Sequence, residues 1–106
     1  MVNTRTKMQR TNNIVRAWLT ASGYKNLYFF PHGRFSKDYH IDDQDFDGIC
    51  TYKNKIVFFQ CKTNCKPTRK KLKEYDEMSD RFGIICLWFN YINRKGLEVN
   101  NEKTKE

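Results

Sequence analysis

Residues 47–62 read DGICTYKNKIVFFQCK, and the rest of the chain is organised around this stretch. Two β-prone runs, Phe46–Tyr52 and Ile56–Lys62, flank the polar pair Lys53-Asn54. Two such runs separated by a short polar break are typical of a β-hairpin. We therefore predict two antiparallel strands here.

A loop of two residues, or of four taken symmetrically, sets Thr51 opposite Ile56 and Asp47 opposite Gln60. Directly opposed side chains of an antiparallel pair stand on one face, with Cβ atoms about 5 Å apart. Lys62 shares that face because side chains alternate with a period of two. An acid, an amide and an ammonium group are thus predicted to gather on one side of the hairpin.

The opposite face of the second strand carries Val57, Phe59 and Cys61, which are core residues by type. Polar groups gathered beside such a core are costly unless they pair with one another or share a ligand. Two interpretations follow. Asp47 and Lys62 form a solvated cross-strand ion pair, or the group binds a cation.

The chain has 106 residues, enough for one domain with a single modest core. We place this domain at residues 1–99, because residues 100–106 lack apolar side chains and should fray. No apolar run approaches the ~20 residues of a membrane span, and no signal peptide is evident. We expect an intracellular, cytoplasmic protein.

The net charge of +8 is unevenly distributed. Residues 1–37 hold seven bases and no acid, residues 38–47 hold five Asp and no base, and residues 48–106 hold thirteen bases and seven acids. This pattern suits a metal-dependent enzyme acting on a polyanion, because bases attract phosphates while carboxylates gather the cation. The alternative is a basic domain whose charge serves only solubility.

The cysteines favour reduced thiols. Cys50, Cys61 and Cys86 each lie in an apolar strand-like run, where a thiol behaves as a small hydrophobic group. Cys61 and Cys65 form the one close pair, but no second pair or His couple lies near them, so a zinc site is only weakly indicated.

Periodicity and stop signals predict the remaining elements. One helix covers Thr6–Ser22 and ends at Gly23, and a second follows the N-cap Thr68 and ends at Gly83. Further strands are predicted at Asn26–Pro31, Gly83–Tyr91 and Leu97–Val99, with a loop at residues 32–44. This order predicts an α/β fold with a mixed sheet flanked by helices.

The first helix carries a polar residue on its apolar side. Asn12 falls in the middle of the stripe formed by Met8, Val15 and Leu19. An unsatisfied buried amide costs about 1–3 kcal/mol. Asn12 is therefore either a satisfied interior residue or part of a site.

The second helix begins with three bases, Arg69, Lys70 and Lys71. The helix dipole disfavours bases in the first turn, but a docked anion would offset this. We interpret these residues, with Lys66, as a contact to a nucleic-acid backbone. A solvated basic face is the alternative.

Asp47, twelve intervening residues, an amide, one further residue and Lys62 resemble the core signature of the PD-(D/E)XK nuclease superfamily. Within it, the chain most resembles archaeal-type Holliday junction resolvases, which share the segment seen here as Arg81-Phe82-Gly83. The resemblance covers most of residues 5–99. It implies a restriction-endonuclease-like αβββαβ core.

By this resemblance, Asp47, Gln60 and the carbonyl of Cys61 would hold Mg²⁺ or Mn²⁺, and Lys62 would orient the attacking water or lower its pKa. Asn12 stands where the resolvases have a glutamate on the first helix, and Gln60 stands where the family usually has Glu. Two acids are thus replaced by amides. The candidates to supply the missing charge are Asp42, Asp43 and Asp45.

The loop before Asp47 also resembles the family's, which has a short Arg-Ser-Gly-type segment there. We expect Arg34, Ser36 and Lys37 to meet phosphate, with an ordinary polar connector as the alternative. His32 and His40 are expected to have no role.

The resemblance implies a metal-dependent DNA endonuclease, selective for branched DNA such as a four-way junction. It also implies a homodimer, so that two sites cut two strands. One alternative is a nucleic-acid-binding module of the same fold whose catalysis is weakened or lost. Another is a nuclease of the same fold that acts on RNA or on nucleic acids in general.

Overall fold

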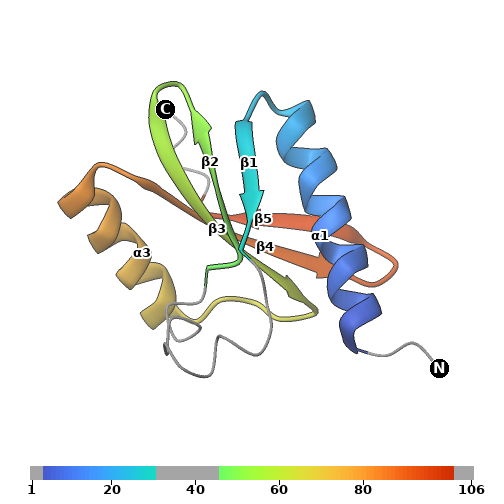
Figure 1. Cartoon of the computed structure of the whole chain (residues 1–106). Coiled ribbons are helices and arrows are strands. Elements are labelled where there is room, and N and C mark those ends of the chain that lie inside the picture. The colour runs from blue at the N-terminus through green and yellow to red at the C-terminus, as the bar shows by residue number, and fades with distance from the viewer. Residues whose placement is uncertain (1–3, 31–45, 102–106) are drawn as a thin grey trace, which may run out of the picture.

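The computed structural model describes residues 4–30 and 46–101, with side chains from residue 9 onward. Within these residues, five strands form one mixed sheet flanked by two helices (Figure 1). The elements in chain order are α1 (Thr4–Ala21), β1 (Lys25–Phe29), β2 (Gly48–Tyr52), β3 (Lys55–Thr63), α3 (Arg69–Phe82), β4 (Ile85–Ile92) and β5 (Gly96–Asn100). The predicted α/β class with a helix-flanked mixed sheet is confirmed.

The central hairpin forms as predicted. β2 and β3 are antiparallel with Thr51 opposite Ile56, and a two-residue turn joins them. In this turn Lys53 and Asn54 have φ angles of 48° and 67°. Left-handed angles at both positions define the type I′ turn, whose twist matches that of the flanking strands. The turn thereby fixes the register of both strands.

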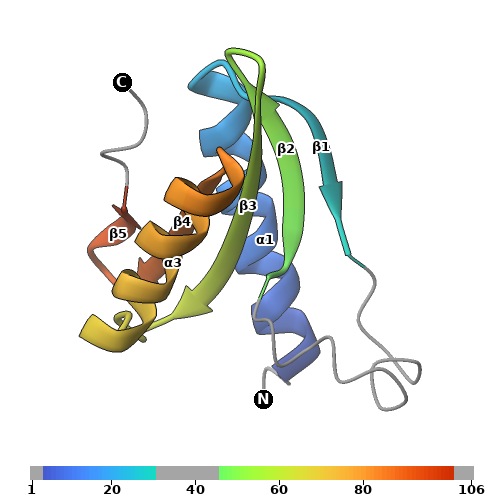
Figure 2. The ribbon, with the colours of Figure 1, turned by 90° about the vertical axis from the view of Figure 1, so that its left-hand side faces the viewer.

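The strands lie in the sheet in chain order, β1-β2-β3-β4-β5. Each neighbouring pair is antiparallel except β3 and β4, which are parallel. α3 forms the crossover that a parallel pair requires. α1 packs against β3 and β1, whereas α3 packs against β4. The two helices lie on opposite faces of the sheet (Figure 2).

The main core lies between α1 and the sheet. It consists of Val15, Leu19, Tyr24, Cys50, Val57, Phe59, Ile85, Leu87 and Phe89. A smaller cluster on the α3 face contains Tyr75, Cys86 and Trp88. Alternate residues of β4 face different helices, which is why its first six residues are all buried. This confirms the predicted buried strand.

The helix ends match the sequence signals. The Thr68 hydroxyl accepts a hydrogen bond from the Lys71 backbone N–H at 3.0 Å, so Thr68 is the N-cap of α3. Gly83 ends α3 with φ of 66°, and its N–H donates to the Ser79 carbonyl at 2.9 Å. Gly23 follows α1 with φ of 91°. Glycine is favoured at both stops because it adopts positive φ without a steric penalty.

All four cysteines are free: Cys50 and Cys86 are buried, Cys61 is half-buried and Cys65 is exposed. In the part of the chain that the structure describes, no helix is long and apolar enough to cross a membrane.

Candidate functional site

Asp47 lies where β1, β2 and β3 converge. Its backbone N–H donates to the Phe59 carbonyl of β3 at 2.8 Å, and its carbonyl accepts from the Phe30 N–H, next to β1, at 2.8 Å. Its carboxylate Oδ2 accepts a hydrogen bond from the backbone N–H of Cys61 at 2.7 Å. The side chain is 9% exposed. Asp47 is thus fixed by three strands at once.

The structure differs here from the predicted pairing of Asp47 with Gln60. The β2–β3 register ends at the pair Gly48 and Phe59. Asp47 N–H bonds to Phe59 rather than to Gln60, so the register slips by one residue. The Asp47 carboxylate then accepts the hydrogen bond from the Cys61 N–H. In a regular strand pair, a backbone carbonyl would accept this bond. The carboxylate therefore binds the backbone of β3 instead of standing across from Gln60.

Gly48 permits this convergence. A Cβ atom at this position would lie 2.6 Å from the Tyr28 carbonyl oxygen and 2.9 Å from Cε1 of Phe59. No real Cβ approaches a backbone oxygen so closely. Sequence reasoning passed over Gly48, although a glycine directly after a candidate catalytic Asp is a visible signal of close backbone approach.

Gln60 is the second polar residue of the site. It is 4% exposed, and its Oε1 atom has no hydrogen-bond partner among the described residues. Its Cα is paired with that of Trp88 in the parallel β3–β4 ladder, so its side chain lies on the α3 face. A buried amide oxygen without a donor costs about 1–3 kcal/mol. A cation or a donor from a ligand would remove that cost.

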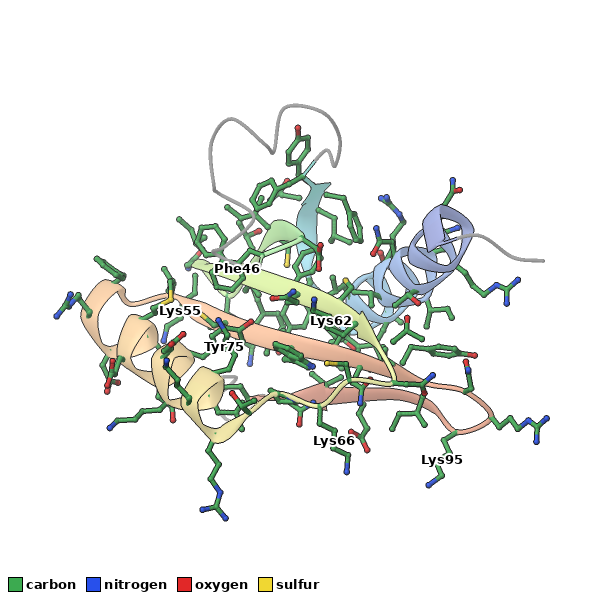
Figure 3. All side chains as sticks on the ribbon, turned by 90° about the horizontal axis from the view of Figure 1, so that it is seen from below. Phe46, Lys55, Lys62, Lys66, Tyr75 and Lys95 are labelled. Atoms are coloured by element: carbon green, nitrogen blue, oxygen red, sulfur yellow. The ribbon has the colours of Figure 1, made fainter. Side chains whose placement is uncertain are left out.

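Lys62 is half-buried and lies two residues beyond Gln60 on the same face of β3. Figure 3 shows Lys62 over the sheet, whereas Lys66 and Lys95 extend away from it. The predicted sharing of one face by Gln60 and Lys62 therefore agrees with the strand geometry. Asp47 reaches the backbone of the residue between them.

The backbone N–H of Cys61 donates a hydrogen bond to Asp47. The expected role of the Cys61 carbonyl as a metal ligand stays a prediction. Its side chain packs against the core on the α1 face. Burial raises the pKa of the Cys61 thiol, and the negative charge of Asp47 raises this pKa further. Both effects favour the neutral thiol of Cys61 over the thiolate.

The first helix places Thr11, rather than Asn12, against β3. Thr11 is 4% exposed, and its hydroxyl lies 2.8 Å from that of Thr63 at the end of β3. Asn12 is half-buried and precedes Arg16 by one turn. The Arg16 guanidinium lies 4.7 Å from the centre of the Phe29 ring, so Asn12 is on the β1 side of α1. Asn12 thus flanks the buried stripe instead of occupying its middle.

The basic start of α3 lies beyond the end of β3. Lys66, Arg69 and Lys70 are exposed. Lys71 is half-buried, and its Nζ forms an ion pair with Glu74 at 3.3 Å. Three of the four phosphate contacts predicted around the start of α3 are therefore exposed, while Lys71 is paired with an acid of the same helix.

The loop leading into α3 is held by β4. The buried Asn90 side chain accepts a hydrogen bond from the Cys65 N–H at 2.9 Å, and Trp88 Nε1 donates to the Cys65 carbonyl at 2.9 Å. Asn90 is 1% exposed. Sequence reasoning also passed over this residue, although a polar residue in an apolar strand is a signal of an internal hydrogen bond. These bonds fix where Lys66 leaves the sheet.

Several predicted residues lie outside the described parts of the chain. These are Arg34, Ser36, Lys37, Asp42, Asp43 and Asp45, together with His32 and His40. Within residues 9–30 and 46–101, no group of three or more His, Cys, Asp or Glu side chains forms a metal site. The described oxygen donors of the candidate site are those of Asp47 and Gln60.

No protein-family model matches this chain, and no curated protein matches its sequence. The case for a site therefore rests on three features of the structure: the Asp47 carboxylate bound to β3, the Gln60 oxygen that has no hydrogen-bond partner among the described residues, and Lys62 on the same face of β3.

Proposed function

We propose that this protein is a metal-dependent endonuclease that hydrolyses DNA phosphodiester bonds in branched DNA such as a four-way junction. The observation that carries the proposal is the buried Gln60 oxygen without a described partner, on a strand whose next residue, Cys61, binds the Asp47 carboxylate and whose Lys62 shares the face of Gln60. An acid, an oxygen donor and an ammonium group at one point are the components that a hydrolytic site for phosphodiesters needs.

The donor set fits a hard divalent cation. Asp47 and Gln60 offer oxygen atoms, and oxygen ligands suit Mg²⁺ or Mn²⁺ better than zinc. Asp47 and Gln60 would hold the ion, with the Cys61 carbonyl as the further ligand implied by the family resemblance. When bound, the ion supplies Lewis-acid stabilisation of the negative charge on the phosphoryl oxygens.

The protein groups have separate roles. The Cys61 N–H holds the Asp47 carboxylate in one orientation, and a fixed group needs little reorganisation during the reaction. Lys62 donates hydrogen bonds to orient the attacking water toward the phosphorus. The neutral oxygen expected from Asn12 stays a prediction, because Asn12 lies on α1, whereas the Gln60 side chain lies on the opposite, α3 face of the sheet.

Exposed bases supply the contact to DNA. Lys66, Arg69 and Lys70 surround the start of α3, where free backbone N–H groups also favour phosphate. Arg34, Ser36 and Lys37 extend this contact in the proposal. We further propose that the protein acts in the cytoplasm as a homodimer, which would present two sites to the two strands of a junction.

A junction-cleavage assay with Mg²⁺ or Mn²⁺ tests this function. We expect paired, symmetric nicks from the wild-type chain. Asp47→Asn keeps an oxygen acceptor for the Cys61 N–H but removes the charge, and Lys62→Ala removes the donor. Each should lower the cleavage rate by about 100-fold or more, while thermal unfolding confirms that the variants are folded.

Lys95→Ala is the matched control, because Lys95 is an exposed lysine in the β4–β5 turn and its loss removes the same charge outside the site. Its cleavage rate should stay close to that of the wild type. Cleavage that persists in Asp47→Asn would refute the assignment of the site.

A nucleic-acid-binding module of the same fold is the second candidate. The observation in its favour is that amides stand at Asn12 and Gln60, so that Asp47 supplies the only formal negative charge among the described residues of the site. In that case the wild-type chain binds a junction tightly and cuts it with neither metal.

A further inference from the structure

One face of the sheet carries a row of apolar side chains across three strands. The register pairs Tyr28 of β1 with Ile49 of β2, and Ile49 with Phe58 of β3. Directly paired residues point to the same side of a sheet. Ile56 lies two residues before Phe58 and shares this side. We call these four residues the outer row.

The outer row lies on the α3 side of the sheet, yet α3 packs against β4. Figure 2 shows α3 in front of β4, α1 behind the sheet, and no described helix in front of β1 and β2. Tyr28 is 55% exposed and Ile56 is 48% exposed. Large exposed apolar groups that adjoin one another mark an interaction surface more often than isolated ones do.

Aromatic rings continue this surface at both ends. Tyr28 packs edge-on against Phe30, with ring centres 5.9 Å apart. Phe58 contacts Phe46 at 5.2 Å, and Phe46 stacks on Tyr75 of α3 at 5.5 Å. Flat rings thus extend from the edge strand β1 to α3.

The described strands that carry the outer row are basic. Residues 25–30 and 48–63 contain four Lys and no acid, whereas α3 on the same face carries charges of both signs. Lys25 is exposed and is paired with Thr51 next to the row, and Lys62 lies on the same face beyond Gln60. A second copy of the chain would bring like charges together here, whereas a polyanion would be attracted.

A polyanion that also has flat rings to stack on aromatic side chains is an unpaired nucleic-acid strand. Base stacking on exposed aromatic residues, combined with a basic track for the backbone, is how proteins bind single strands without sequence preference. A base pair inside a duplex does not offer its ring face in this way. The combination of exposed Tyr28, the rings beside it and the bases around it therefore selects an unpaired strand.

We propose that the outer row is a stacking surface for unpaired DNA, with Tyr28 as its exposed anchor, and that the strand runs along β3 toward Lys62. The choice of DNA over RNA rests on the proposed function; the stacking surface itself rests on the geometry. Unpaired bases at a branch or flap would then be held next to the site at Asp47.

Fluorescence anisotropy measures the binding of the protein to a labelled oligothymidylate. In EDTA this measurement tests the proposal without requiring cleavage. Tyr28→Ala should weaken binding of the single strand about fivefold or more, because one base–aromatic stack is lost. Tyr28→Phe keeps the ring and should bind like the wild type. Binding to a duplex of the same length should be nearly unchanged in both variants.

Phe82→Ala is the matched control, since Phe82 is a 62% exposed aromatic residue of α3 that is not part of the outer row. Its loss should leave single-strand binding unchanged. Equal effects of Tyr28→Ala and Phe82→Ala, or an equal loss of duplex binding in Tyr28→Ala, would overturn the proposal. The proposal would also be overturned if Tyr28→Ala changed only the oligomeric state, measured by sedimentation. The outer row would then bind a second copy of the chain.

Two further arms separate this proposal from the nuclease. Asp47→Asn should bind the oligothymidylate in EDTA at least as tightly as the wild type, because without a metal ion the carboxylate only repels the phosphates. If junction cleavage fails while the Tyr28 effect remains, the enzymatic function is wrong and the stacking surface stands. An oligouridylate that binds with clear preference over oligothymidylate would overturn the choice of DNA.

Discussion

Gly48 is the residue on which the placement of Asp47 depends. The Tyr28 carbonyl and the Phe59 ring both occupy the space that a Cβ atom at this position would need. β1 cannot move away without stretching the bond between Phe30 N–H and the Asp47 carbonyl. The lack of a side chain at residue 48 therefore allows three strands to meet at the candidate catalytic carboxylate.

Gly48→Ala should lower the free energy of unfolding by about 1–3 kcal/mol, the usual cost of inserting a methyl group into a filled space. It should also slow junction cleavage, because the strands that hold Asp47 must separate. Urea unfolding followed by tryptophan fluorescence measures the first effect.

Gly83→Ala serves as the comparison for this variant. A Cβ at Gly83 meets no atom within 4 Å, but its φ of 66° is unfavourable for alanine. It should cost about 1–2 kcal/mol through the backbone alone and leave cleavage unchanged. A Gly48→Ala protein as stable as the wild type would show that the strands part without difficulty.

Individual residues differ in how far the sequence could place them. Gln60 and Lys62 follow from alternation along one strand, which needs no knowledge of the rest of the fold. Thr11 and Asn12 differ by one position on a helix, and which of them meets β3 depends on how the helix is rotated over the sheet. Contacts such as Trp18 on Phe89, with ring centres 5.3 Å apart, set that rotation, and spacing alone does not reveal them.

Among the elements, the β2–β3 hairpin was the most predictable, because its turn residues and both strands carry local signals. The irregular ends were not. The β1–β2 register shifts between Lys25 and Tyr28, next to Asn26 with φ of 59°, and the β2–β3 ladder stops at Gly48. Both irregularities arise where the conformation of the backbone depends on more than one neighbouring strand. The residue pattern along a single strand therefore does not predict them.

The start of α3 is the element-scale feature most open to test. Thr68 caps the helix whose first turn carries Arg69 and Lys70. Thr68→Ala should reduce the free energy of unfolding by about 1 kcal/mol, since the Lys71 N–H loses its acceptor. Thermal or urea unfolding measures this change.

Thr20→Ala is the control for the capping variant, because Thr20 is an exposed threonine in the last turn of α1. That change should alter stability by less than about 0.5 kcal/mol. An equal effect of the two substitutions would mean that the cap contributes nothing beyond helix propensity.

At the scale of the whole molecule, buried thiols make stability depend on pH. Burial raises the pKa of Cys50 from 9.0 to about 12. The pKa of Cys86 rises to about 11, chiefly through burial and also through the charge of Asp76, although the nearby Ser79 hydroxyl lowers it. Both thiols therefore stay protonated in the folded chain at pH values where the unfolded chain has lost these protons.

The direction of the effect follows from proton binding. Above pH 9.0 the unfolded chain holds fewer protons than the folded one, so stability falls as pH rises, by up to about 1.4 kcal/mol per pH unit for each thiol. This stabilising contribution is complete below pH 9.0 and is lost progressively as pH rises toward about 11 for Cys86 and about 12 for Cys50. Urea unfolding at a series of alkaline pH values measures the slope.

A Cys50→Ala, Cys86→Ala double variant isolates the thiols from the lysines and tyrosines that titrate in the same range. Its free energy of unfolding should fall less steeply with pH than that of the wild type. The loss of stability caused by the two cavities at neutral pH does not affect this slope. Identical slopes in the two proteins would show that the thiols ionise equally in both states.

The strands lie in the sheet in the same order as in the chain, and this order has a consequence for biosynthesis. During translation, each strand that leaves the ribosome finds its partner already present at the growing edge, and none has to be inserted between two strands that have paired. The one step that must wait is the parallel addition of β4, which needs α3 to be made first. Nascent chains that end before residue 85 would therefore contain α1 and the three strands of the meander but lack Ile85, Leu87 and Phe89 of the main core, so β4 is the strand that completes this core.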